Sequence, residues 1–176
     1  MCDVSAVRRP VYDFREVEES DLALIRQWLE TPHWREWWGD PDTGIAEIRE
    51  HMDSVSVEPL LIEWNGAPIG YLQSYDPHLE DDHPYADQPF GTLGVDLSIG
   101  AAEMLGQGHG SGALRAFAET LFAEGVPRLV IDPHPDNARA IRAYAKAGFV
   151  PFDRRTSIYG EALLMALDNP DPEEAA

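Results

Sequence analysis

Two carboxylates and one tyrosine in the second half of the chain are placed where they can move protons. Asp96 lies in an apolar segment, residues 93–99, and Asp132 ends a second one, residues 128–132. Tyr144 comes one predicted helix later. A carboxylate near a strand end can take a proton from an incoming amine, and a phenol can give one to a leaving group. Simpler roles are a strand bulge for Asp96, a turn cap for Asp132 and core packing for Tyr144.

A glycine-rich run lies between the two apolar segments. It follows residues 93–99 and opens a helix predicted over residues 113–122. Glycines let the main chain approach an anion closely, and the free N–H groups and dipole of a first helical turn favour that anion. The run therefore predicts a phosphate cradle, with a plain tight turn as the alternative. It consists of Gln107, Gly108, His109, Gly110, Ser111 and Gly112, with the His109 ring expected in solvent.

Two common phosphate-binding folds do not match this run. No Lys-Ser or Lys-Thr pair follows it, which excludes a P-loop, and no strand–helix–strand unit with a glycine turn and a later acidic residue stands near the start of the chain. A second helix is predicted from an N-cap at Asp136 to a stop at Gly148. Its apolar face is made of Ala140, Ile141, Tyr144 and Ala147.

The order and spacing of these motifs are similar to those of the GCN5-related N-acetyltransferase (GNAT) superfamily. The glycine run has the pattern Gln-x-x-Gly-x-Gly, and residues 137–149 have the pattern Asn-x-x-Ala-x-x-x-Tyr-x-Lys-x-Gly-Phe. The resemblance implies acetyl-CoA as cosubstrate, bound by residues 107–112 and Asn137, and no metal. It also implies an α/β fold: a mixed, mostly antiparallel sheet of about six to seven strands, flanked by helices and splayed between the fourth and fifth strands.

Within that superfamily the chain most resembles the aminoglycoside 6′-N-acetyltransferases. The resemblance is carried by Trp-Trp-Gly at 37–39, by residues 65–75 and by Gly-Val-Asp at 94–96. It implies that Asp96 is the base for the acceptor amine and that Tyr144 protonates the leaving thiolate. The acceptor-binding residues that it implies are Trp38, Gln73, Tyr75, Asp96 and Asp132.

The acceptor side departs from the family pattern. The loop over residues 76–90 differs in sequence and carries Glu80, Asp81 and Asp82, which are either a solvated loop or ligands for ammonium groups. A siderophore or another lysine-derived amine, or a protein N-terminus, is therefore an alternative acceptor. A non-catalytic CoA-binding module is the alternative of a different class, although such a module has no need for the pair of Asp96 and Tyr144.

Length, composition and charge limit the classes of protein to which the chain can belong. The chain has 176 residues, 13 basic against 32 acidic, and a formal charge of −19. This balance argues against broad nucleic-acid binding and would attract a polycationic small molecule. No apolar run is long enough to span a membrane, no signal peptide is visible, and Cys2 is the single cysteine. We expect one domain over residues 1–168, a disordered acidic tail over 169–176, a cytoplasmic location, and a monomer or homodimer.

The remaining elements are read from periodicity. A strand is predicted over 12–17, a helix over 21–29, a short aromatic segment over 33–38, and a helix capped by Thr43. Asn65-Gly66 between two apolar runs predicts a β-hairpin.

Overall fold

The computed structural model describes residues 11–172, and within that range one seven-stranded sheet is flanked by five α-helices. Cys2 and residues 173–176 of the expected tail lie outside it. The elements are β1 (Tyr12–Glu16), η1 (Glu19–Asp21), α1 (Leu22–Leu29), α2 (Pro32–Trp38), α3 (Pro41–His51), β2 (Val57–Trp64), β3 (Ala67–Tyr75), β4 (Leu93–Ile99), η2 (Ala102–Met104), α4 (His109–Ala123), β5 (Arg128–Ile131), α5 (Ala138–Ala147), β6 (Val150–Ser157) and β7 (Gly160–Asp168).

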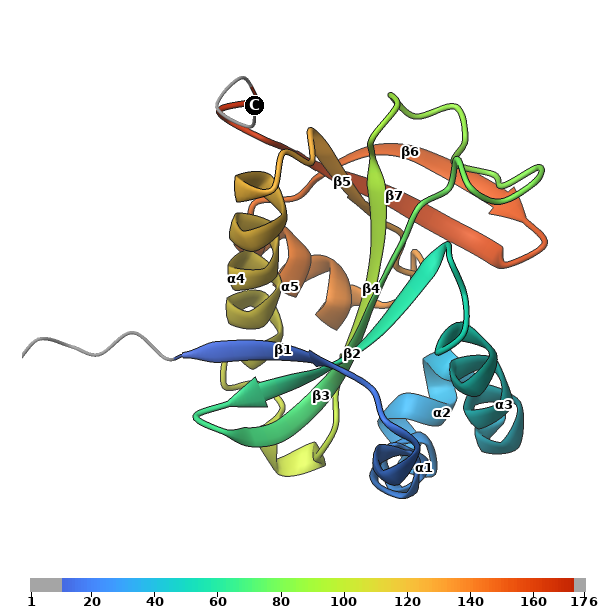
Figure 1. Ribbon diagram of the computed structural model, residues 1–176, viewed down its shortest axis with the longest axis vertical. Helices are drawn as coiled ribbons and strands as arrows, with labels where there is room; N and C mark the ends of the chain where they lie inside the picture. Colours follow the sequence, from blue (N-terminus) through green and yellow to red (C-terminus); the bar gives the residue numbers. More distant parts are fainter. Residues whose placement is uncertain (1–10, 173–176) are drawn as a thin grey trace, which may run out of the picture.

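The sheet is antiparallel except at its centre. Its order is β1-β2-β3-β4-β5-β7-β6, and only β4 and β5 run parallel (Figure 1). These two pair through Leu93 with Leu129 and Gly94 with Val130, and no further pair follows among the described residues. From Gly94 onward the strands separate, so the expected splay between the fourth and fifth strands is confirmed. The gap leaves backbone groups of β4 free for a ligand.

The predicted hairpin is present. β2 and β3 are joined at Asn65 and Gly66, whose φ angles are 49° and 84°. A two-residue turn that matches the twist of the strands needs positive φ at both positions, and the Asn-Gly pair adopts it most readily. The turn fixes the register of β2 and β3, and β3 in turn pairs with β4 so that Gln73 lies opposite Asp96.

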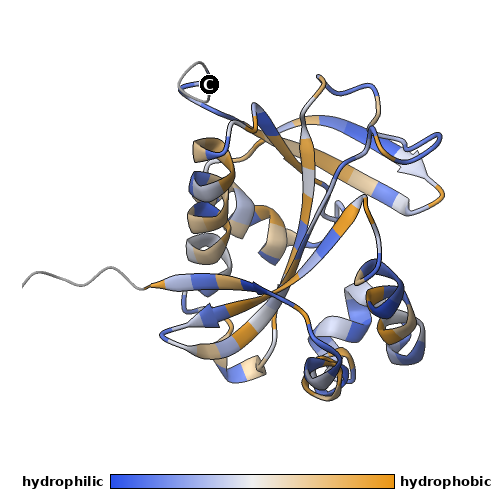
Figure 2. Ribbon diagram, in the orientation of Figure 1, coloured by the Kyte–Doolittle hydropathy of each residue, from blue (hydrophilic) through white to orange (hydrophobic). Residues whose placement is uncertain are grey.

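Helices cover both faces of the sheet. α4 and α5 lie over one face, and α1, α2 and α3 cluster over the other (Figure 1). Alternation along the strands supplies both cores: Leu60 packs with the α4 and α5 side, whereas the next residue, Leu61, packs with α1 to α3. Hydrophobic segments of the central strands and the inward sides of α4 and α5 stand out in Figure 2. Within residues 11–172 no helix has the length and apolar character needed to cross a membrane.

Two helix starts differ from the sequence predictions. α3 is capped by Asp40, whose side chain accepts from the Thr43 backbone N–H, so Thr43 is the recipient and not the cap. α5 is capped by Asn137, which accepts from the Ala140 N–H at 3.2 Å, and not by its neighbour Asp136. Asp and Asn are about equal as caps, so the sequence alone does not choose between adjacent ones.

Two further segments are more ordered than the sequence suggested. The aromatic segment after Pro32 is a helix, α2, because proline suits the first helical position. Beyond β7, Asn169 is only 8% exposed. Its side chain donates to the carbonyls of Phe122 and Val126, which ties the chain to the end of α4. The chain is therefore anchored through Asn169, one residue into the segment that we expected to form the tail.

Candidate active site

A cleft of about 1300 Å³ opens where β4 and β5 separate. It runs from α2 and α3, past the ends of β3, β4 and β5, to the start of α4 and along α5. Most residues that the sequence proposed for function line it together: Trp38, Gln73, Tyr75, Asp96, Gly108, His109, Gly110, Ser111, Asp132, Asn137 and Tyr144. The structure thus brings these residues together in one continuous cleft.

The carboxyl groups of Asp96 and Asp132 lie close enough across the strand gap that each alters the pKa of the other. Burial raises the pKa of Asp96. Burial also raises the pKa of Asp132, and the charge of Asp96 raises it further. Two carboxylates this close resist being ionised together, so the pair tends to retain one proton until a cation arrives. The arrangement suits the binding and deprotonation of an ammonium group.

A buried relay orients Asp96. The Gln73 side-chain amide donates to Asp96 Oδ2 at 3.0 Å, and the Tyr71 hydroxyl donates to Gln73 Oε1 at 2.8 Å. Tyr71 is fully buried, and burial keeps its pKa above the ordinary value. The phenol is therefore a permanent donor that fixes which end of the Gln73 amide meets Asp96.

Asp132 has a donor of its own that the sequence did not reveal. Tyr85, from the loop over residues 76–91, donates its hydroxyl hydrogen to Asp132 Oδ2 at 2.5 Å. Tyr85 is 2% exposed, although it lies in a polar, proline-containing loop. The one hint in the sequence is that a large aromatic residue, Tyr85, stands in a mostly polar segment.

Tyr75 and Tyr144 close the floor of the cleft. Tyr75 packs directly over Gly94, where an added Cβ would lie 2.0 Å from the ring. This contact explains why glycine stands two residues before Asp96. Tyr144 lies on the buried face of α5, and burial raises its pKa, so its hydroxyl stays protonated and can donate a proton within the cleft.

The glycine run forms the other end of the cleft. α4 begins at His109, with Gly108 at the cap in a left-handed conformation (φ 83°). The first hydrogen bond back to the cap is Gly112 N–H to Gly108 C=O at 2.9 Å. The N–H groups of the three residues before Gly112 therefore have no helical carbonyl to bind and point outward. A Cβ on Gly106 or Gly108 would meet nothing within 4 Å, so an anion can approach this backbone closely.

Three predictions within the run need correction or restriction. His109 does not face solvent: it is 6% exposed, and its Nδ1 shares a 3.0 Å hydrogen bond with the Tyr12 hydroxyl. The helix begins at His109 itself, which turns the ring back onto β1. Gln107 lies outside the cleft and donates to the Glu103 carbonyl. Gly112 also lies outside it, and its absent Cβ makes room for Tyr12 at 2.9 Å.

The fold and the family are shown by comparison with known proteins. A family profile described as "Acetyltransferase (GNAT) domain" matches residues 17–156. The chain is 38% identical over 160 residues to the aminoglycoside N(6′)-acetyltransferase type 1 of Klebsiella pneumoniae, a match that covers 86% of this chain and 80% of that protein.

The chain belongs to the GNAT acetyltransferases.

Solved structures agree with this assignment. The crystal structure of the aminoglycoside acetyltransferase AAC(6′)-Ib in complex with coenzyme A superposes with a TM-score of 0.81 and 35% identity, over 94% of this chain and 96% of that one. The complex of AAC(6′)-Ib with coenzyme A and kanamycin gives a TM-score of 0.80 and 33% identity over the same shares. The predicted superfamily, the predicted fold and the narrower resemblance to aminoglycoside 6′-N-acetyltransferases are confirmed.

The two ends of this GNAT cleft carry opposite charge. The Arg and Lys side chains among its lining residues all lie on α5, which packs beside α4: Arg139, Arg142 and Lys146. Most of the carboxylates come from α2, α3, the 76–91 loop, β4 and the segment after β5: Glu36, Glu47, Glu50, Glu80, Asp96 and Asp132. Asp136 is the one carboxylate of the lining that lies beside the start of α5. Of the three acidic loop residues proposed as ammonium ligands, Glu80 lines the cleft, and Asp81 and Asp82 do not.

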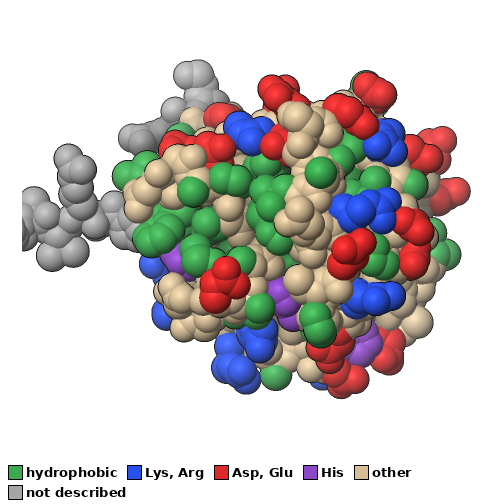
Figure 3. Space-filling view, turned by 90° about the horizontal axis from the view of Figure 1, so that it is seen from below, with side chains coloured by type: hydrophobic (Ala, Val, Ile, Leu, Met, Phe, Trp, Pro, Cys, Tyr) green, Lys and Arg blue, Asp and Glu red, His purple; other side chains and the backbone are tan. Residues whose placement is uncertain are grey.

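The cationic end fits the pyrophosphate of coenzyme A. It combines outward backbone N–H groups, an open glycine surface and cationic side chains, which together suit a phosphate anion. By contrast, the molecular face in Figure 3 shows hydrophobic, acidic and basic side chains intermixed. No group of three or more His, Cys, Asp or Glu side chains within residues 11–172 is arranged to hold a metal ion.

The aromatic residues of α2 divide between core and cleft. Trp34 is fully buried and donates to the Ile99 carbonyl at 2.8 Å, so it is a core residue. Trp38 is half-buried, packs 5.2 Å from the Trp34 ring and lines the cleft, as the sequence proposed. Trp37 stacks on His134 at 5.6 Å and joins α2 to the segment after β5.

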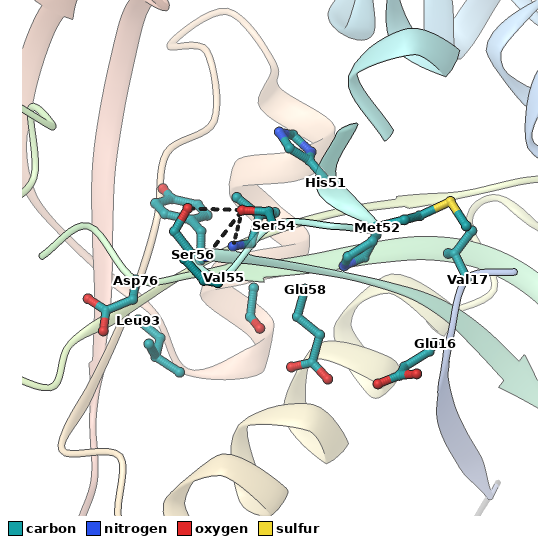
Figure 4. A pocket seen from close by; sticks show the side chains of 14 residues that line it. Glu16, Val17, His51, Met52, Ser54, Val55, Ser56, Glu58, Asp76 and Leu93 are labelled. Atoms are coloured by element: carbon teal, nitrogen blue, oxygen red, sulfur yellow. Dashed lines mark hydrogen bonds between the residues drawn. The ribbon is translucent and has the colours of Figure 1, made fainter. Parts of the chain in front are cut away.

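A second cavity of about 430 Å³ lies beside the acceptor end (Figure 4). Ser54 and Ser56 are hydrogen-bonded to one another on its wall, and Glu16 and Glu58 extend toward the same side of it. Burial raises the pKa of Glu58, and the charge of Glu16 adds to that effect. This cavity includes neither the glycine run nor the facing carboxyls, so it lacks the parts that acetyl transfer requires.

Proposed function

We propose that this enzyme transfers the acetyl group of acetyl-CoA to the 6′-amine of an aminoglycoside or a similar polycationic amine. The observation that carries the proposal is one cleft with a cationic phosphate cradle at one end and two facing carboxyls at the other. The relatives add support, because AAC(6′)-Ib is known in complexes with coenzyme A and with kanamycin.

Asp96 and Asp132 receive the acceptor. Aminoglycoside amines are largely protonated at neutral pH, and an ammonium group between the two carboxyls favours their ionised forms. Asp96 then takes a proton from the ammonium group, which frees the nitrogen lone pair. The Gln73 amide holds the carboxylate of Asp96 during this step.

Groups in the cleft can also stabilise the charge that develops on the carbonyl oxygen and on the leaving sulfur during the transfer. The amine nitrogen forms a bond to the thioester carbonyl carbon, and the carbon–sulfur bond breaks. Backbone groups of β4 beyond Gly94, which have no partner on β5 among the described residues, can stabilise the carbonyl oxygen. Tyr144 gives its proton to the thiolate sulfur, and the second proton that the nitrogen loses after the attack restores the Tyr144 phenol.

α4 and α5 hold the donor. The N–H groups of His109, Gly110 and Ser111 bind the pyrophosphate, and the α5 cations neutralise its charge. Asn137 lines the cleft while its side chain caps α5, so we assign it the positioning of that helix. We propose that the enzyme works in the cytoplasm, as a monomer or homodimer.

The test is thiol release from acetyl-CoA with a panel of acceptors: 6′-amino aminoglycosides, diamines, lysine-derived hydroxamate precursors and short peptides. Release with the aminoglycosides, and a mass shift of one acetyl group on the 6′-nitrogen, is the expected result. Release with the peptides or hydroxamate precursors alone would replace the acceptor. Tight acetyl-CoA binding without transfer to any amine would favour a non-catalytic module.

A further inference from the structure

Arg155 of β6 holds the 76–91 loop against the sheet. Its guanidinium donates to both carboxylate oxygens of Asp87, at 2.9 and 2.7 Å, and to the Pro84 carbonyl at 2.6 Å. A second carboxylate, Asp153, accepts from Arg155 Nε at 2.9 Å. Two-pronged contacts of this kind fix orientation as well as distance. The loop segment over residues 84–87 is therefore tied to the sheet at a defined position.

Tyr85 lies inside the segment that Arg155 holds. The guanidinium sits 5.8 Å from the centre of its ring. On the other side the His83 ring meets Tyr85 edge-on at 5.2 Å and packs against Tyr75 at 5.4 Å. The Tyr85 backbone N–H also donates to His83 Nδ1 at 3.1 Å. These contacts fix the orientation of the Tyr85 ring, with its hydroxyl hydrogen-bonded to Asp132.

The two facing carboxyls are therefore held by different donors. Asp96 accepts from an amide that Tyr71 orients, and Asp132 accepts from the Tyr85 phenol. Burial raises the pKa of Tyr85, and the charge of Asp132 adds to that effect, so the phenol remains a donor. A short donor hydrogen bond favours the ionised form of the carboxyl that accepts it.

We infer that Tyr85, clamped by Arg155, is a positioning residue for acetyl transfer. Its hydroxyl fixes the orientation of the Asp132 carboxyl and favours its ionisation when the acceptor ammonium arrives, beside Asp96, which takes the proton. The inference rests on the proposed function, because it assigns a division of labour within that same site. It also explains why a large aromatic side chain is buried in an otherwise polar loop.

The groups around Asp132 determine how the pair titrates. The charge of Asp96 of β4 acts on it, its own charge acts on Tyr75 of β3 and Tyr144 of α5, and Tyr85 donates a hydrogen bond to it. The next shell contains His83, Glu80 and Arg155. Burial raises the pKa of Asp132, and the Tyr85 hydrogen bond opposes that rise. Removing the phenol hydroxyl should thus let the carboxyl pair hold its proton to higher pH.

The experiment is kcat/KM for kanamycin as a function of pH in the wild-type enzyme and in Tyr85→Phe. We expect about a tenfold loss, in line with one hydrogen bond to a charged group, and an acidic limb displaced to higher pH. Tyr159→Phe is the matched control, because that ring also neighbours His83 and has no hydrogen bond to either carboxyl in the described structure. It should keep the wild-type acidic limb.

A second variant tests the clamp without touching the carboxyl pair. Asp87→Asn weakens the hold of Arg155 on the loop, and it should displace the acidic limb in the same direction by less. If Tyr85→Phe loses rate equally at every pH, or loses none, the positioning role is wrong. If the wild-type enzyme transfers no acetyl group to kanamycin or any other 6′-amino aminoglycoside, the proposed function fails first, and the two failures are distinguished.

Discussion

The two ends of the cleft are built in different ways. The donor end is mostly backbone: the first turn of α4 and glycines that lie within a single run of residues. The acceptor end consists of side chains from α2, α3, β3, β4, the 76–91 loop and the segment after β5. A backbone cradle accepts one constant group, the pyrophosphate, whereas a wall assembled from distant side chains can change its acceptor without disturbing the cradle. The predictions below test this separation.

The largest effect is expected at Asp96. Asp96→Asn keeps the shape of the side chain but removes the base, so kcat should fall by about a thousandfold, within the range that general-base catalysis supplies. Donor affinity should stay near the wild-type value, because the cradle lies at the other end of the cleft. Steady-state kinetics together with calorimetric titration of acetyl-CoA measure both. Turnover close to that of the wild-type enzyme would remove Asp96 from its assigned role.

A charge in the cradle should have the converse effect. Gly110→Asp places a carboxylate beside the pyrophosphate, and like-charge contact of this kind should weaken acetyl-CoA binding by about a hundredfold or more. Gly110→Ala is the matched control: a Cβ there meets only Ile99, at 4.0 Å, so binding should change little. Calorimetric titration of each variant decides. Equal loss in both would indicate packing and not charge.

The donor end of the cleft could be predicted from the sequence more fully than the acceptor end. The cradle is local, so its glycines and the helix behind them could be predicted from spacing. His109 was placed wrongly because α4 starts four residues earlier than the predicted segment, which turns that ring toward Tyr12. Tyr85 was missed because its burial depends on Arg155 of β6, about 70 residues away, and no local pattern encodes that contact. Asp96 and Asp132 were found through family resemblance, and their contact follows from the β4–β5 pairing.

The buried carboxyl of Asp132 at the acceptor end should lower the free energy of unfolding of the protein. Because burial and Asp96 raise the pKa of Asp132 above its unfolded value, its charged form disfavours folding at neutral pH. Asp132→Asn should therefore raise the free energy of unfolding by on the order of 1 kcal/mol near neutral pH. The gain should shrink as pH falls and disappear below about 4, where the carboxyl is protonated in both the folded and the unfolded state. Thermal unfolding across this pH range measures it, and a gain that persists unchanged at low pH would contradict it.

The smallest effect is expected at Tyr12, whose hydroxyl contacts the first residue of α4. This variant tests whether the backbone cradle depends on that side chain for its position. Tyr12→Phe removes the hydroxyl that shares a hydrogen bond with His109, the first residue of α4, and leaves the ring that packs against Gly112. One such hydrogen bond is worth about 1 kcal/mol, so acetyl-CoA affinity should fall by about fivefold or less while kcat is retained. Thr120→Val removes a hydroxyl from the exposed side of the same helix and should leave the affinity unchanged. If the two variants bind acetyl-CoA alike, α4 is positioned by its apolar packing alone, and the cradle is independent of Tyr12.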